Sequence, residues 1–490
     1  MKAFSFHTIL VKLTGLLLLI PASVHGQQSN TLYMLHQVPQ SNLLNPAVQL
    51  RCKWYVGIPA IASLYTAYSN TAFTWNDLAG SSEWNLYGIE EQMHRADLYS
   101  VEAEVHPLSL GYRHRSFYFT FNLSEKARLY PTLPGDLAEA LLYGNAAFVG
   151  ETARFNALRP NGYYHREYAL GISKVLGRSW VAGIRARLIF GKASLYTGHS
   201  RSGLTTDENS FRLLLEGDYT LNSSFPLTIS EDAEGNISDV TVNEINYYRM
   251  LINRGNPGFA LDLGSIYRYN EKITLSASLL DLGLVRWKTD LNNVRAQGSF
   301  EYEGIDPGTE ILSGAFVRQM RDSVIDAFEV TVTSLPYYSS LPVQLFLGGS
   351  YRLSEMIMLG AVNRNVFFRS KIHTSLTLSA HADLFDSFLA GLSWSLLNNS
   401  IWNIGAVIAF HGRGFQFHLV SDNLLGFFYP FDSRSINLRA GFNLMLGCPR
   451  EREGKYESES YGPTPGGGDC SWTGKYKFRK KYRKKAEKDR

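Results

Sequence analysis

The sequence predicts an all-β protein: a transmembrane antiparallel β-barrel of about 14–16 strands with long outer loops carrying short helices. Three observations lead to this fold class. Apolar and polar residues alternate along most of the chain, a secretory signal precedes the first such segment, and the connections are either tight or long. A barrel accounts for all three because each strand turns one face to lipid and the other to the lumen.

The clearest alternation lies between residues 401 and 446. Phe415, Phe417 and Leu419 are separated by Gln416 and His418, and the two flanking segments repeat this spacing. A period of two residues indicates a strand with one apolar face and one small or polar face. Water-soluble sandwiches alternate in the same way, so the choice of a barrel also depends on the signal and the loops.

Residues 1–26 form the predicted signal peptide. Lys2 and Lys12 supply the positive charge, residues 13–20 form a short apolar run, and small residues precede the cleavage site. This run is far shorter than the roughly 20 residues that a spanning helix needs. We therefore expect an exported mature chain that begins at Gln27.

The expected strands follow one another with tight or long connections. They lie near residues 97–114, 116–123, 163–174, 180–190, 211–222, 224–230, 258–269, 271–281, 343–353, 356–365, 371–382, 386–396, 401–411, 415–419 and 435–446. The long connections cover residues 124–162, 192–209, 282–342 and 422–432. Tight turns of such barrels are periplasmic, so both termini are expected in the periplasm. Tight turns and long loops alternate along the chain except between residues 210 and 269. The alternation is restored if residues 224–230 form an additional strand.

Two connections have apolar residues at helical spacing. The stronger pattern covers residues 306–328 and the weaker one residues 242–252. These segments are expected either to form ordered external loops or to fold into the lumen as a plug.

Composition agrees with a barrel and excludes other classes. Charged residues make up 19% of the chain, below the roughly 25% of soluble domains, and 28 Tyr and 28 Phe suit aromatic girdles. The net charge of +4 is misleading, because residues 475–490 carry ten Lys or Arg and two acids. The rest of the mature chain is near-neutral to acidic, which is not the profile of a nucleic-acid-binding protein.

The chain has three cysteines, Cys52, Cys448 and Cys470. In an oxidising periplasm Cys448 and Cys470 could form a disulfide, which would stabilise the fold by about 3 kcal/mol in the chain-entropy model. Cys52 would then have no disulfide partner. The spacing does not match a zinc site.

Charged and histidine side chains recur on the expected lumen face. The candidates are Arg185, Arg187, Arg212, Glu216, Asp218, Asp262, His373, His381 and Arg439. The arginines either line an anion-attracting pore or pair with lumen carboxylates and close it. His373 and His381 share a face with serines and threonines, the minimum for an acyl hydrolase, but no carboxylate is placed to orient them. We therefore predict no enzyme, no cofactor and no metal.

The C-terminal tail interleaves aromatic and basic residues behind a Gly/Pro-rich linker. Its basic residues include Lys475, Lys477, Arg479, Lys480, Lys481, Arg483, Lys484 and Lys485. In the periplasm such a tail would meet anionic cell-wall polymer, lipid head groups or an acidic partner protein. A disordered, solvated end is the alternative.

Several short motifs occur in a characteristic order. They are LLNPA at residues 43–47, GFALDLG at 258–264, SLLDLG at 278–283 followed by Trp287, LP at 341–342 and GGSY at 348–351. This arrangement resembles an uncharacterised family of Bacteroidota outer-membrane barrels. That family looks related to the barrels of type IX secretion and gliding motility (the PorV and PorP/SprF type) and, distantly, to FadL-like transporters. The resemblance implies an outer-membrane location and no assigned activity.

These observations divide the chain into a signal peptide (1–26), an outer-membrane barrel (27–447) and a periplasmic linker with a basic tail (448–490). The leading functional prediction is a channel or transporter for a small or apolar solute. The alternative is a non-conducting interaction barrel that supports a secretion or surface apparatus, with a barrel hydrolase as a minor alternative. The expected partners are outer-membrane lipid and, through the tail, periplasmic or surface proteins or cell-wall polymer, without nucleic acid.

Overall fold

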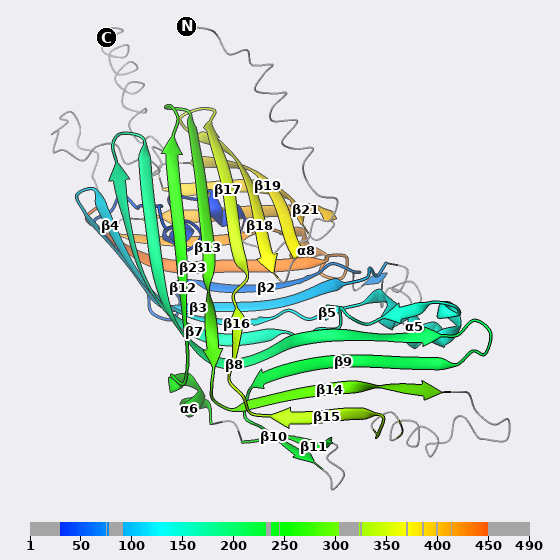
Figure 1. The fold of residues 1–490 in the computed structure, drawn as a ribbon. Helices are drawn as coiled ribbons and strands as arrows, with labels where there is room; N and C mark the ends of the chain where they lie inside the picture. The colour runs from blue at the N-terminus through cyan, green and yellow to red at the C-terminus, as the bar shows by residue number, and fades with distance from the viewer. Residues whose placement is uncertain are drawn as a thin grey trace, which may run out of the picture.

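The computed structural model describes residues 30–448, apart from 75, 78–91, 232–236, 245, 303–322, 324–325, 369–370, 385–386, 398–399 and 413. The described chain is dominated by β-strands (Figure 1). In this part of the chain no helix is long and apolar enough to cross a membrane.

Fourteen antiparallel strands form a closed barrel, which confirms the predicted fold class. The first is interrupted and consists of β1 (Trp54–Gly57) and β2 (Leu64–Asn70). Around the barrel follow β3 (Asp97–His114), β4 (Phe117–Leu129), β7 (Gly162–Leu176), β8 (Trp180–Thr206), β12 (Asn256–Arg268), β13 (Ile273–Trp287), β17 (Val343–Arg352), β18 (Ile357–Phe368), β19 (Lys371–Leu384), β20 (Phe388–Leu397), β21 (Ser400–His411), β22 (Phe415–Ser421) and β23 (Ser435–Leu446). Pairing of β23 with both β1 and β2 closes the barrel.

A disulfide joins the first and last strands of the barrel. In the β1–β23 ladder Trp54 lies opposite Leu446, so Cys52 and Cys448, two residues further along each strand, meet and form the bond. The predicted pairing of Cys448 with Cys470 is therefore wrong. The observed bond forms because the strand register brings together two cysteines that are separated by 396 positions in the sequence. Cys470 lies outside the described residues.

A second feature is a β-sheet that extends beyond the barrel, here called the wing. It consists of the second half of β8 together with β9 (Leu213–Ser224), β14 (Leu291–Tyr302) and β15 (Phe328–Thr333). Strand β8 is long enough to pair with β12 through Gly191 and with β9 from Ser194 onward. In Figure 1 the wing turns away from the upright strands β12, β13 and β17 and projects from the lower part of the barrel.

The wing explains why the expected order of turns fails between residues 210 and 269. Strands β9 and β12 run in the same direction, one after the other, along β8, so together they take the place of one strand. The predicted barrel strand at residues 224–230 is wrong. Instead β10 (Leu227–Glu231) pairs with β11 (Ile237–Val242) in a separate two-stranded sheet.

The remaining elements belong to the connections. They are β5 (Thr132–Leu133), α5 (Gly135–Tyr143), η2 (Gly144–Phe148), β6 (Thr152–Arg154), α6 (Tyr247–Ile252), β16 (Tyr337–Ser340) and α8 (Leu425–Phe428). Helix α6 occupies the second half of the weaker helical pattern, whose first residue, Val242, ends β11. Most of the stronger pattern, residues 306–328, lies outside the described residues, and its last residue, Phe328, begins β15.

The two faces of the barrel wall differ as the alternation predicts. In the closing strands Phe415, Phe442 and Leu444 are exposed on the outer face, while Gln416 and Asn443 are fully buried inside. Large exposed apolar side chains occur around the whole wall, including Phe119, Leu170, Ile184, Leu188, Phe259, Leu284, Leu347, Leu378, Leu392 and Ile408. The barrel is thus apolar outside and polar inside.

Candidate functional site

The N-terminal segment of residues 30–52, here called the plug, fills part of the barrel (Figure 1, dark blue). It contains α2 (Asn30–Tyr33) and η1 (Pro39–Leu43), and most of its residues are buried. Its side chains hydrogen-bond to distant parts of the wall: Asn30 to Ser375 at 3.0 Å, Gln40 to Asn443 at 2.9 Å and Gln49 to Ser173 at 3.1 Å. The plug is therefore attached to β7, β19 and β23 at once.

Apolar contacts add to this attachment. Leu32, Leu35 and Val38 form a buried cluster with wall residues Leu389, Val407, Ala409 and Val420. The ring of Tyr33 stacks on Phe346 of β17 with centroids 4.9 Å apart. The plug thus has a hydrophobic core of its own with the wall, in addition to its polar contacts.

The LLNPA motif forms the turn by which the plug rests on the wall. The Asn45 side-chain oxygen accepts a hydrogen bond from the amide of Ala47 at 3.0 Å, which fixes the turn. A Cβ atom at Gly183 or Gly264 would lie 2.6 or 2.8 Å from the Ala47 nitrogen, closer than packing allows. The GFALDLG motif is thereby explained in part, because its last glycine leaves room for the plug. The turn precedes β1 by several residues.

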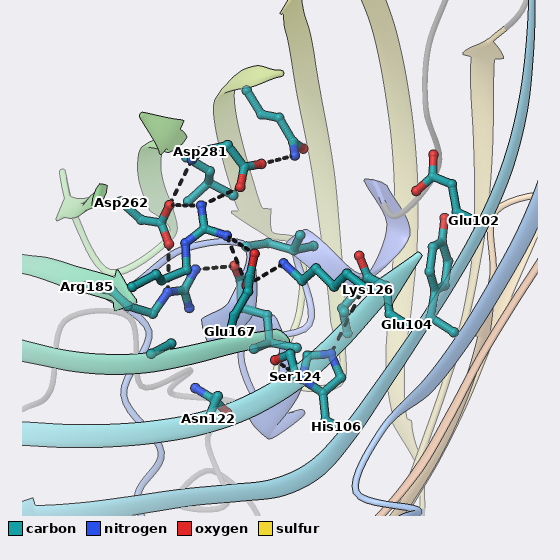
Figure 2. A pocket seen from close by; sticks show the side chains of 18 of the residues that line it. Glu102, Glu104, His106, Asn122, Ser124, Lys126, Glu167, Arg185, Asp262 and Asp281 are labelled. Carbon is teal, nitrogen blue, oxygen red and sulfur yellow. Dashed lines mark hydrogen bonds and ion pairs between the residues drawn. The ribbon is translucent and has the colours of Figure 1, made fainter. Parts of the chain in front are cut away.

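The plug and the surrounding wall enclose a chamber with about 660 Å³ of empty space, including the solvent at its mouth (Figure 2). Its apolar lining consists of Leu32, Leu43 and Leu44 of the plug and Tyr65, Ala169 and Leu280 of the wall. Charged side chains from the wall make up most of the rest. They are Glu102, Glu104, Lys126, Arg128, Glu167, Arg185, Arg187, Asp262, Asp281, Arg364 and Arg439.

Arg187 is the centre of the charge network in this chamber. Its guanidinium contacts Glu167 at 3.1 Å and Asp262 at 2.9 Å, and it also pairs with Asp281. Glu167 in turn accepts from Lys126 at 3.0 Å and contacts His165 at 2.9 Å. Figure 2 shows Lys126, Glu167, Asp262 and Asp281 converging from neighbouring strands. Only 4% of the Arg187 side chain is exposed, so its charge depends on these carboxylates.

Arg185 connects the network to the plug. Its Nε donates to Asp262 at 2.7 Å, while its two terminal nitrogens donate to the plug carbonyls of Asn42 at 2.8 Å and Leu43 at 2.6 Å. One side chain therefore holds the wall and the plug together.

Asp281 enters the chamber through a β-bulge. The β12–β13 register shifts between Leu261 and Leu263, and Asp281 has a φ of 65°. An extra residue in a strand reverses the parity of the faces. Asp281, which the simple alternation places on the lipid face, instead pairs with Arg187 and accepts a hydrogen bond from Gln344.

The opposite side of the chamber has separate ion pairs. Arg128 contacts Glu102 at 2.6 Å, and Arg439 contacts Glu104 at 3.0 Å. Ser124 hydrogen-bonds to Nδ1 of His106 at 2.8 Å, and Nε2 of this histidine lies 3.8 Å from Glu104. Arg364 donates to Gln344 at 2.6 Å and stacks over Phe346.

The structure brings together some of the sequence candidates and separates others. Arg185, Arg187, Asp262 and Arg439 line the chamber, and all four are nearly fully buried. His381 is buried in the barrel and His373 is partly buried, and neither belongs to the chamber lining.

The lumen placement of Arg212, Glu216 and Asp218 is wrong. Arg212 lies just before β9 and the other two lie in β9, a wing strand, so all three are outside the barrel. Arg212 pairs with Glu301 of β14, and the two side chains are 50% and 53% exposed. A hydrogen bond from Arg295 lowers the pKa of Asp218.

Sequence reasoning missed several residues of the chamber, above all Glu167, Lys126 and Arg364. Glu167 lies on the same face of an expected strand as Ala169 and Gly171, so the alternation could have identified it as a lumen residue. Lys126 lies in the second half of β4, which continues six residues beyond the expected end of that strand. The basic tail lies outside the described residues.

A closed barrel with an internal plug defines the class of this protein. The chain belongs to a family of unknown function (DUF5723), whose model matches residues 46–422. No curated protein sequence matches the chain.

Among solved structures, the similar ones include three outer-membrane transporters or their homologues. The Pseudomonas putida toluene transporter TodX has 10% identity and a TM-score of 0.32, covering 86% of this chain and 93% of its own. The Ralstonia pickettii toluene transporter TbuX has 8% identity and a TM-score of 0.38 over 83% and 94%. A Pseudomonas aeruginosa FadL homologue has 9% identity and a TM-score of 0.34 over 87% and 100%. These scores are low, and the barrel assignment rests on the strand pairing of this chain.

Proposed function

We propose that this protein is an outer-membrane channel or transporter for a small solute, closed at rest by its own plug. The observation that supports this function best is the plug itself, a continuous segment attached across the lumen beside a solvent-accessible chamber. A barrel filled only by wall side chains would have no part that could move aside.

The location in the outer membrane is part of the same proposal. Exposed Leu, Ile and Phe side chains cover the outer face, where a soluble protein rarely has large apolar patches. A closed barrel satisfies all wall hydrogen bonds within the wall, as lipid requires. Strand β1 begins and β23 ends at the tight-turn end, which agrees with a periplasmic position of both termini. The relation to type IX secretion barrels stays a prediction.

Plug movement can be tested with a disulfide lock between the plug and the wall. A Cβ atom at Gly360 of β18 would lie 3.6 Å from the Cβ of Met34, within the range for a disulfide. In the double variant Met34→Cys/Gly360→Cys, made with Cys470→Ser, we expect solute flux into liposomes when reduced and little flux when oxidised. Each single variant, and the parent with and without reductant, control for the native Cys52–Cys448 bond.

The outcome separates the proposed function from its alternatives. Equal flux in the locked and unlocked states would show that the plug is not the gate. Absence of flux in both states would contradict the transport function altogether.

The wing favours an interaction barrel as the second candidate. It extends the protein beyond the barrel wall and carries exposed apolar residues at its margins, such as Phe211 and Leu335, which are 61% and 65% exposed. A sheet that projects from the barrel in this way offers a surface to a protein partner. Cross-linking from a cysteine at position 335 to an envelope protein, together with absence of solute flux, would favour this function.

A hydrolase stays the minor alternative, supported by the contact of Ser124 with His106. In an acyl hydrolase the histidine also needs an orienting carboxylate at hydrogen-bond distance. Glu104 lies 3.8 Å away and is held by Arg439. Labelling of Ser124 by a fluorophosphonate would favour hydrolysis, and no labelling is expected.

A further inference from the structure

We propose that the chamber favours small hydrophilic anions over cations and apolar solutes. This inference rests on the proposed transport function and specifies its solute class. It follows from three properties of the chamber lining: its net charge, the way its carboxylates are used, and the large share of charged side chains in it.

The lining carries one positive charge in excess. Its six cations are Lys126, Arg128, Arg185, Arg187, Arg364 and Arg439. Its five carboxylates are Glu102, Glu104, Glu167, Asp262 and Asp281. In a cavity with low-dielectric walls even a small excess of one sign raises the local concentration of the opposite ion.

The carboxylates are already engaged by cations of the wall. Glu102, Glu104, Glu167, Asp262 and Asp281 pair with Arg128, Arg439, Lys126, Arg185 and Arg187, in that order. A cationic solute would have to displace one of these cations and leave it buried without its partner, which is strongly unfavourable. A guanidinium, by contrast, has five N–H donors and can serve a wall carboxylate and a solute anion together. The network is therefore asymmetric and favours anions.

An apolar solute fits the chamber poorly. Eleven of the side chains that line it are charged, and its apolar ones are Leu32, Leu43 and Leu44 of the plug with Tyr65, Ala169 and Leu280 of the wall. A hydrocarbon in this space would remove water from charged groups without replacing their hydrogen bonds. Sites for apolar ligands have the opposite composition, with mainly hydrophobic walls and few polar groups.

The test measures ion selectivity in planar bilayers across a KCl gradient. Two variants change the charge of the chamber in opposite directions. Arg364→Gln removes the excess positive charge, and Glu102→Gln adds to it. Arg212→Gln makes the same charge change as Arg364→Gln on the wing and serves as a control. All measurements are repeated with Gly264→Leu, which is expected to loosen the plug.

We expect chloride to permeate more easily than potassium once Gly264→Leu has loosened the plug. Arg364→Gln should lower the chloride-to-potassium permeability ratio by about threefold and Glu102→Gln should raise it, while Arg212→Gln leaves it unchanged. Cation preference, or a ratio that ignores both chamber variants, overturns this inference and leaves the transport function standing. If no variant conducts, even with Gly264→Leu, both proposals fall together.

Discussion

Removing the guanidinium of Arg187 is the most severe test of the charge network. The substitution Arg187→Gln keeps a polar but shorter side chain and takes away the positive charge that Glu167, Asp262 and Asp281 share. Glu167 and Asp262 are nearly fully buried, with side-chain exposures of 3% and 0%. Arg185 and Lys126 still contact two of the carboxylates, whereas Asp281 loses its ion pair.

The expected loss of stability follows from the cost of an uncompensated buried charge. Breaking one buried ion pair by removing one partner typically costs about 3–5 kcal/mol. Arg187 serves three carboxylates, and the two remaining cations offset part of the loss. We therefore expect Arg187→Gln to lower the unfolding free energy by about 3–5 kcal/mol rather than by several times that amount.

The measurement is guanidinium-induced unfolding of the refolded barrel in detergent micelles, followed by tryptophan fluorescence. Arg212→Gln is the matched control, because the Arg212–Glu301 pair is half exposed on the wing and is expected to contribute little. If Arg187→Gln shifts the unfolding midpoint no more than Arg212→Gln does, the chamber charges are not a coupled buried network. The chamber would then not be held closed by its ion pairs.

Three further predictions concern other parts of the structure. Replacing Cys52 by Ser should destabilise the barrel by as much as about 6 kcal/mol in the chain-entropy model, since the disulfide spans 396 positions; Cys470→Ser should leave the unfolding midpoint unchanged. Gly264→Leu should prevent the plug from resting on the wall at Ala47, so limited proteolysis should cleave residues 30–52 faster than in the parent protein. Resistance of the barrel to the same protease would show that its strands still form. Trp287 is fully buried where the wing joins the barrel, and it donates a hydrogen bond to Ser339 at 2.8 Å. Trp287→Ala should lower the unfolding free energy by about 3–5 kcal/mol and speed proteolysis within the wing, and an unchanged cleavage pattern would contradict its role there.

The barrel strands could be predicted because their alternation is imposed by two different environments. Each wall residue faces either the outside or the lumen, so a period of two residues recurs in strand after strand. The same reasoning placed Arg185, Arg187, Asp262 and Arg439 on one side of the wall, and the structure brings them together. Pattern alone was sufficient there because it fixes which face of the wall each side chain occupies.

The features that sequence reasoning missed depend on the register between distant strands or on local breaks in the period. Cys52 and Cys448 meet only because β1 and β23 pair in one particular register. Asp281 turns inward because a bulge shifts the parity by one residue. The length of β8, which extends past its barrel partner, moves Asp218 from the lumen to the wing.

The plug was missed for a different physical reason. Its residues lack a period because the segment has no single apolar face: it packs against the wall on several sides. Irregular backbone is stable there only because polar wall groups satisfy it, as the side chain of Arg185 does for the carbonyls of Asn42 and Leu43. Such satisfaction is a property of the assembled barrel and leaves no pattern in the segment itself.

In the proposed transporter, movement of the plug would break few of the contacts that hold the chamber charges. Of the chamber cations, Arg185 joins plug and wall, so plug movement breaks its bonds to the Asn42 and Leu43 carbonyls. The pairs of Arg187 with Glu167 and Asp262 connect wall strands to one another and need not change. Arg185 also keeps Asp262 as a partner at 2.7 Å, so it would not be left as a lone buried charge. The plug could therefore move without dismantling the charge network, and the opened lumen would keep the excess positive charge that we expect to select its solutes.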